Sequence, residues 1–104
     1  MNTNHSKIIS EFATTALIYC GDYLYEMPTA LKVISKCREL GVTILGLDFF
    51  RAAQDGIEPT MISANFSELS EHPDSCALSV SAASRVLSTG MPEGSNYVMF
   101  TFDD

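Results

Sequence analysis

One acidic residue stands alone in the most apolar stretch of the sequence. The segment GVTILGLDFF, Gly41 to Phe50, continues from a glycine through β-branched and apolar residues and places a single carboxylate, Asp48, near its end. Burying an unpaired carboxylate is costly, so Asp48 must have a partner or reach solvent. We expect local hydrogen bonding or an ion pair with Arg51 first, and contact with a binding partner second.

The histidines, cysteines and serines lack the spacing of catalytic or metal sites. Nucleophilic catalysis needs Ser or Cys with a His base and an orienting acid. Ser70, Glu71 and His72 have these residue types, but adjacency in sequence does not make a triad. No CxxC or HxxxH pair occurs, and no glycine-rich loop opens a helix. The sequence therefore predicts no catalytic residue, no metal and no cofactor, and a protein that is not an enzyme.

The negative charge is concentrated in the second half of the chain. The formal net charge is -7, and from Met1 to Arg51 five acids and five bases cancel. From Ala52 onward eight acids face one base, Arg85. Phosphate repels such a surface, so nucleic acid is excluded as a partner. A basic protein suits this surface better as a partner, but on composition alone we favour the interpretation that the charge only keeps a small protein soluble.

The candidate partner-binding residues are therefore mainly acidic. Two tyrosines from the segment GDYLYEM join them, because tyrosine combines apolar area with a hydroxyl group. Packing over the start of the following helix is the other role for these tyrosines, and it is the one we favour. The full set is Asp48, Asp55, Glu58, Glu68, Glu71, Asp74, Asp103, Asp104, Tyr23 and Tyr25.

Length and composition describe one domain over residues 1–104. Hydrophobic residues make up 46% of the chain, enough for a core. No apolar run approaches the roughly 20 residues of a membrane span, and the N-terminus lacks a secretory signal, so we expect a cytoplasmic protein without membrane contact. The cysteines are far apart and odd in number, which indicates buried free thiols instead of a disulfide framework. They are Cys20, Cys37 and Cys76.

Periodicity predicts two helices after residue 27, over residues 28–40 and within 72–90. Pro28 suits the first turn of the first helix, and Gly41 suits its left-handed stop. The apolar stripes are Ala30, Leu31, Ile34, Cys37 and Leu40 in the first helix and Cys76, Val80, Ala83 and Leu87 in the second. Residues 8–17 also fit a helix. The neighbouring TTALIYC could be a strand, and we favour the helix there.

Strands are predicted over residues 41–50, 57–63 and 96–102. The first is apolar on both faces, as in a central strand. Asp55 and Gly56 form a turn to the second, and Pro59 lacks a ladder donor, which indicates an edge strand. The last strand alternates, with Val98, Phe100 and Phe102 on one face and Tyr97, Met99 and Thr101 on the other. The sum is an α/β (α+β) domain, with a small three- or four-stranded mixed sheet and two to three helices packed on it.

The order of these segments resembles the small immunity proteins of bacterial polymorphic toxin systems, in particular the group designated immunity protein forty. That family shows a helix, a glycine and a strand ending in Leu-Gly-Gly-Asp. Leu45, Gly46 and Asp48 match this pattern, and Leu47 replaces the second glycine. Phe66 is the nearest substitute for a tryptophan that is typical after the second strand.

The resemblance, which covers residues 31–102, implies a protein that binds and blocks one cognate toxin without an active site of its own. The toxin would be the C-terminal domain of a contact-dependent inhibition effector, and many such toxins are basic nucleases. A small α/β enzyme or ligand-binding domain of unknown substrate is the alternative, and a dimeric adaptor is a third. The oligomeric state stays open.

Overall fold

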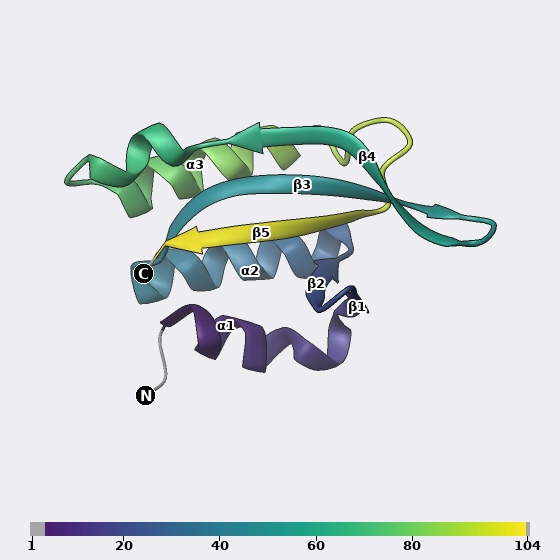
Figure 1. The fold of residues 1–104 in the computed structure, drawn as a ribbon. Coiled ribbons are helices and arrows are strands. Elements are labelled where there is room, and N and C mark those ends of the chain that lie inside the picture. The colour runs from purple at the N-terminus through teal and green to yellow at the C-terminus, as the bar shows by residue number, and fades with distance from the viewer. Residues whose placement is uncertain (1–3, 104) are drawn as a thin grey trace.

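The computed structural model describes residues 4–103, which form an α+β domain, as the sequence predicts (Figure 1). The elements in chain order are α1 (Asn4–Phe12), the short 3-10 helix η1 (Ala13–Thr15), β1 (Leu17–Tyr19), β2 (Asp22–Tyr25), α2 (Met27–Leu40), β3 (Thr43–Ala53), β4 (Gly56–Asn65), the 3-10 helix η2 (Ser67–Glu71), α3 (Ser75–Leu87) and β5 (Tyr97–Asp103). Within this part of the chain, no helix combines the length and the apolar character needed to cross a membrane.

The strands of the described residues form one five-stranded antiparallel sheet in the order β1-β2-β5-β3-β4. The prediction of a mixed sheet with three or four strands is wrong on both points. β1 and β2 add a hairpin where the periodicity predicts a helix, and β5 runs antiparallel to both of its neighbours. β4 is the edge strand that Pro59 indicates. β3 is an interior strand, paired with β5 on one side and β4 on the other, as its apolar faces predict, and β5 occupies the middle of the sheet.

The region expected to be helical divides into a helix and a hairpin. α1 ends at Phe12, and Leu17 pairs with Leu24 across the β1–β2 hairpin. The two turn residues, Cys20 and Gly21, have positive φ angles of 51° and 84°. Tight two-residue hairpin turns favour such angles because they match the twist of the strands. Cysteine is not typical of this turn, so the sequence carries little signal for it.

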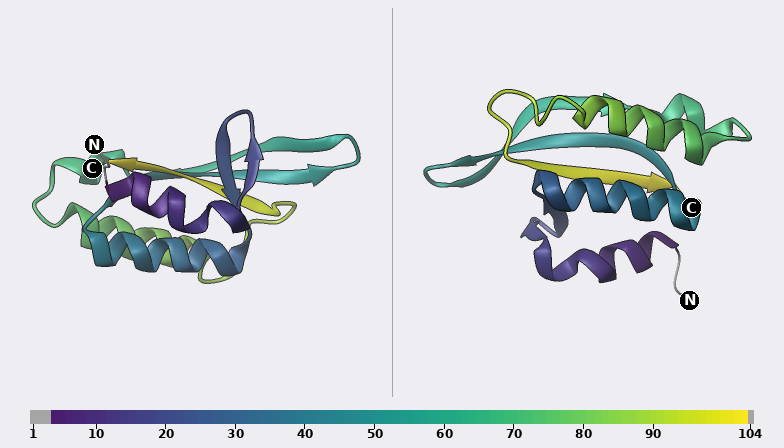
Figure 2. Two further views of the ribbon diagram at one scale, coloured as in Figure 1. Left: turned by 90° about the horizontal axis from the view of Figure 1, so that it is seen from below. Right: turned by 180° about the vertical axis from the view of Figure 1, so that it is seen from behind.

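α2 and α3 cover one face of the sheet, and α1 lies against α2 (Figures 1 and 2). α2 has Pro28 in its first turn and ends at Gly41, whose φ of 75° provides a left-handed cap. The buried side chains of α2 are Ala30, Val33, Ile34 and Cys37. Leu31, predicted on this face, is instead 46% exposed. Val33 packs in the core instead of Leu31.

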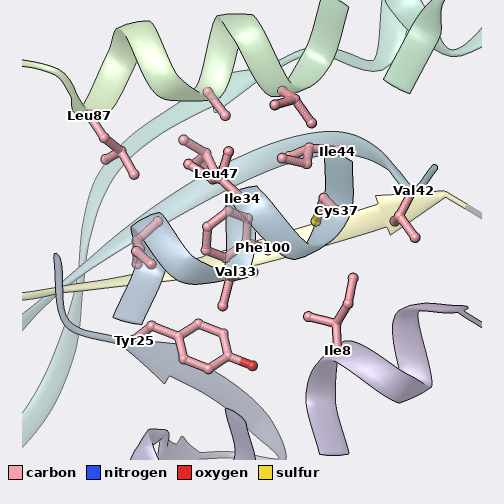
Figure 3. Close-up of a cluster of buried hydrophobic side chains, with 14 of the residues drawn as sticks. Ile8, Tyr25, Val33, Ile34, Cys37, Val42, Ile44, Leu47, Leu87 and Phe100 are labelled. Atoms are coloured by element: carbon pink, nitrogen blue, oxygen red, sulfur yellow. The ribbon is translucent and has the colours of Figure 1, made fainter. Parts of the chain in front are cut away.

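The core lies between the sheet and the helices (Figure 3). Leu47, Val98 and Phe100 contribute to it from the strands, as the predicted alternation of β5 requires. Ile8 from α1 and Tyr25 from β2 complete it on the side away from α3, and both are buried. Because α1 supplies a fully buried side chain, it is an integral part of this core.

Two serines of α3 hold the start of β3. Ser79 is fully buried, and its Oγ accepts a hydrogen bond from the Ile44 N–H at 2.9 Å and donates to the Cys76 carbonyl at 3.1 Å. The hydroxyls of Thr43 and Ser75 are 2.7 Å apart and share a hydrogen bond. These bonds lie next to a shift in the pairing of β3 with β5. They give hydrogen-bond partners to polar groups at the start of β3 that the pairing of β3 with β5 leaves without one.

Polar contacts fasten α1 to the second half of α2. The Asn4 side-chain amide donates to the carbonyl of Leu40 at 3.2 Å. The Lys36 ammonium lies 3.1 Å from a carboxylate oxygen of Glu11 on α1 and 3.1 Å from one of Glu39 on its own helix. Lys36 is therefore a structural residue that links two helices.

The three cysteines are free thiols in different environments. Cys37 is fully buried, as predicted, and burial, followed by the nearby Cys76, raises its pKa to about 12. Cys76 is half-buried, and burial is also the main cause of its raised pKa. The prediction is wrong for Cys20, which is exposed in the β1–β2 turn.

Candidate partner-binding surface

Among the described residues, no helix covers the face of the sheet that points away from α2 and α3 (Figure 2, left). We call this the open face. Directly opposite residues of antiparallel strands point to the same side. One such row crosses all five strands and consists of Leu17, Leu24, Met99, Asp48 and Ser63. Asp48 therefore projects from the open face, while its neighbours Leu47 and Phe49 point into the core.

The Asp48 carboxylate has no hydrogen-bond or ion-pair partner within residues 4–103, so its predicted fastening to Arg51 is wrong. Arg51 binds Glu58 on β4 instead, with its Nε donating to Glu58 Oε1 at 2.7 Å and its Nη2 contacting the same oxygen. The physical reason is alternation, because residues three positions apart in a strand point to opposite faces. Asp48 is half-buried, so its carboxylate is available to a partner.

Two hollows border Asp48 along β3 and β4. One has a volume of about 300 Å³, and its lining includes Gly46, Ser63, Asn65 and Thr101. The other has about 190 Å³, and its lining includes Phe50, Pro59, Met61 and Met99. Asp48 lines both of them. A carboxylate between one more polar and one more apolar recess is the kind of feature that can orient an incoming side chain.

β4 departs from regular pairing beside Asp48. Asp48 pairs with Ser63, and Phe50 pairs with Pro59, so three residues of β4 stand opposite a single residue of β3. Extra residues in one strand bend it and re-aim its side chains.

Thr60 bridges this interruption. Its Oγ1 donates to the carbonyl of Phe49 at 2.9 Å and accepts from the Ile62 N–H at 3.1 Å. Met61 at the apex has a φ of 67°, unusual for a side chain of this kind, and is 88% exposed. The bulge therefore presents a large apolar side chain directly to solvent.

Gly46 is required by the close approach of β4. A Cβ atom on Gly46 would lie 2.9 Å from the carbonyl oxygen of Ala64, which is too close without a shift of the backbone. Leu47, which stands where the resembled family has a second glycine, is fully buried in the core. A glycine at position 47 would leave a gap in this fold.

The other acidic candidates lie at opposite ends of the molecule (Figure 1). Asp55 is exposed in the β3–β4 turn, and Glu58 nearby is held by Arg51. The opposite end, around η2 and the end of β5, carries Glu68, Glu71, Asp74 and Asp103, all exposed. Asp104 lies outside the described residues. The structure thus brings together the acidic residues before α3 and separates them from Asp55 in the β3–β4 turn.

The two tyrosine candidates differ in exposure. Tyr25 is 1% exposed, and its ring packs edge-on against Phe100 with the centroids 6.0 Å apart. It is a core residue, as the favoured packing role implies, and its place among the partner-binding candidates is wrong. Burial, followed by the nearby Tyr23 and Cys37, raises the pKa of Tyr25 to about 12. Tyr23 is half-buried at the edge of the same core.

Apolar side chains of the open face are missing from the predicted set. Tyr19 from β1 lies edge-on to Phe50, with the centroids 5.7 Å apart, so the β1–β2 hairpin reaches over the sheet. Met61 and Ile62, the latter 42% exposed, project from the bulge of β4. The alternation of residues 96–102 did assign Met99 to this face. The bulge itself has no signature in the sequence.

No family model matches the chain, and neither a curated protein nor a solved structure is significantly similar to it. The resemblance to immunity proteins therefore rests on the residues quoted for it and on the order of the elements. Within residues 4–103, no three His, Cys, Asp or Glu side chains are grouped so that they could hold a metal ion.

Proposed function

We propose that this protein is an immunity-type protein that binds one cognate toxin domain in a one-to-one complex and thereby blocks it. The partner is a basic protein domain, and the activity needs no catalytic residue, cofactor or nucleic acid. On this proposal the protein acts in the cytoplasm, where the toxin would arrive. The open face, with Asp48 between two hollows and Met61 beside it, is the observation that carries the proposal.

The composition of this face supports partner binding. Interfaces are enriched in methionine and aromatic side chains around a desolvated centre. Met61 and Ile62 are exposed apolar side chains next to the half-buried Met99. The Asp48 carboxylate has no partner among residues 4–103, so it can pair with a basic side chain of the toxin. The acidic end around η2 would add steering of a basic partner.

The test uses the toxin domain encoded directly upstream of the gene for this protein. Co-expression with this domain in a bacterial host should restore growth, and light scattering after gel filtration should give the mass of a one-to-one complex. The variant Met61→Asp should lose protection, because it puts a charge into an apolar contact. Leu31→Asp is the matched control, since Leu31 is also exposed but lies on α2, away from the open face. Protection by Met61→Asp and none by Leu31→Asp would place the interface elsewhere.

A further inference from the structure

A separate hollow of about 330 Å³ opens between α1, β2 and the end of β5. We call it the β5 hollow, and its lining includes Ile9, Asp22, Tyr23, Tyr25, Phe100 and Thr101. Ligand pockets span roughly 300–1,000 Å³, so this one is at the lower limit and fits a side chain with its flanking peptide groups. It shares only Thr101 and Met99 with the hollows around Asp48.

Tyr25, which lines this hollow, carries an unsatisfied hydroxyl group. The oxygen is buried and has no hydrogen-bond partner within the described residues. In Figure 3 it lies on the side of the Tyr25 ring that faces Ile8 of α1. Burying a hydroxyl without a partner costs free energy, and native proteins seldom leave one unpaired. A ligand that supplies one polar atom here would remove this cost.

The edge of β5 beside the hollow has no neighbouring strand. β3 pairs with β5 along its whole length, from Asp103 to Tyr97. β2 pairs with it only at Met99 and Val98, because the β1–β2 hairpin leaves the plane of the sheet beyond that point (Figure 2, left). From Phe100 to Asp103, backbone groups that point away from β3 therefore have no ladder partner among the described residues. Such an edge accepts an added strand.

The negative charge around the hollow favours an added strand that carries a basic side chain. Asp22 lines it, is exposed and has no ion pair among the described residues. Asp103, also exposed, ends the free edge of β5. The apolar stem of a long basic side chain could lie against Ile9 and Tyr23, while its charged head reaches Asp22. The Tyr25 hydroxyl can accept a hydrogen bond from the same head.

We propose that the β5 hollow binds an extended peptide segment of the partner, which adds as a strand beside Phe100–Asp103 and inserts one Arg or Lys side chain. This inference rests on the proposed function and names where a segment of the basic partner docks. A free small molecule would use the hollow but not the strand edge. An extended peptide uses both, because it carries main-chain donors and acceptors together with the side chain.

The probes are blocked hexapeptides of alternating valine and arginine, with valine–glutamate and valine–glutamine peptides as charge controls. A fourth peptide replaces alternate valines by proline, which cannot donate ladder hydrogen bonds. Titration followed by NMR should show that the arginine peptide binds at least tenfold tighter than the glutamate peptide. Amide exchange should slow within residues 100–103 on binding. Equal binding of the arginine and glutamate peptides, or of the proline peptide, would overturn the proposal.

The variant Tyr25→Phe removes the hydroxyl group and keeps the ring, so it tests what the hydroxyl contributes to binding. It should weaken binding of the arginine peptide by roughly three- to tenfold, the effect of one hydrogen bond, while the stability of the free protein stays the same or rises. A purely structural tyrosine would show the opposite, with stability lost and binding kept. Tyr97→Phe on the same strand is the matched control, because Tyr97 does not line this hollow. Asp22→Asn should weaken binding and reduce its salt dependence.

The toxin domain separates this inference from the proposed function. If the toxin domain binds and Tyr25→Phe and Asp22→Asn bind it as tightly as the wild-type chain, the β5 hollow is not the docking site, although the function stands. If the arginine peptide binds as described but the toxin domain does not, the hollow is supported and the proposed function falls. If neither binds, both are wrong.

Discussion

At the scale of single residues, Asp48 offers the clearest separation of stability from binding. Its carboxylate has no partner in the described fold, and it is half-buried on the open face. Removing its charge should therefore leave the free energy of unfolding within about 0.5 kcal/mol of the wild-type value, as for surface substitutions without special contacts.

The prediction for Asp48→Asn is unchanged stability with weaker binding of the toxin domain. A carboxylate buried against a basic side chain in a complex can be worth about 2–5 kcal/mol on truncation. Urea denaturation measures the first quantity and titration calorimetry the second. Glu93→Gln is the charge-matched control, because Glu93 is exposed in the loop between α3 and β5 and lines neither hollow beside Asp48, and it should change neither quantity. A large loss of stability in Asp48→Asn would mean that the carboxylate has a structural partner after all.

At the scale of elements, the contact of α3 with β3 depends on single hydroxyl groups. Ser79→Ala would leave the buried Ile44 N–H without its acceptor. An unsatisfied buried group of this kind costs about 1–3 kcal/mol, so this variant should be destabilised by that amount. Ser81→Ala on the exposed side of the same helix should be neutral or slightly stabilising, since alanine is the better helix former. Urea denaturation of both variants gives the comparison, and equal stabilities would contradict the role of Ser79.

Elements with strong local signals were predictable from the sequence, and those that depend on distant contacts were not. Pro28 and Gly41 bracket α2 closely, and the alternation in 96–102 reproduces both faces of β5. The β1–β2 hairpin is different, because its short strands are stabilised by pairing with β5, far along the chain, and its turn uses Cys20. The helical periodicity of residues 8–17 could not show that pairing with a distant strand would favour a hairpin over a longer helix.

The candidate site was predictable only in part for the same reason. Alternation within one strand is enough to place Tyr97 and Met99 on one face. Whether that face is covered depends on which side the helices pack, which no local pattern of this chain specifies. The bulge at Met61 arises from the pairing of β4 with β3, so its exposed side chain also escaped prediction.

At the scale of the whole molecule, the titration of two buried groups makes the free energy of unfolding depend on pH in the alkaline range. In the folded protein the pKa of Cys37 is raised from 9.0 to about 12 and that of Tyr25 from 10.0 to about 12. Both groups then lose their protons more readily in the unfolded chain. Their contribution is complete below about pH 9 and is lost as the pH rises toward 12.

The free energy of unfolding should therefore fall between pH 9 and about 12. Chemical denaturation at a series of pH values measures this decline. In Tyr25→Phe the part of the decline between pH 10 and 12 should be smaller, because one of the two groups no longer titrates. A profile that is flat up to pH 12 would show that neither group is protected by the fold.

Charge reversal at the acidic end tests steering of the partner. Changing Glu68, Glu71 and Asp74 together to lysine should slow association with the toxin domain on the order of tenfold at low salt and flatten its salt dependence. Lys32→Glu with Arg38→Glu on α2 is the control and should leave association intact or faster. Lys36 is kept because it links Glu11 and Glu39. Surface plasmon resonance at two salt concentrations measures both, and the opposite pattern would assign the interface to the helices.

The irregular outer edge of β4 is a poor template for pairing with the sheet of another copy of this chain. A straight, exposed edge strand is a template on which another copy can grow a continuous sheet, the first step toward fibrils. Pro59 removes one hydrogen-bond donor from this edge, and the left-handed backbone conformation at Met61 interrupts its extended conformation. β1 at the other edge has only three residues, Leu17–Tyr19. The remaining gap beside β5 is short and lies next to α1, so it suits a single added peptide and offers a growing sheet no continuation.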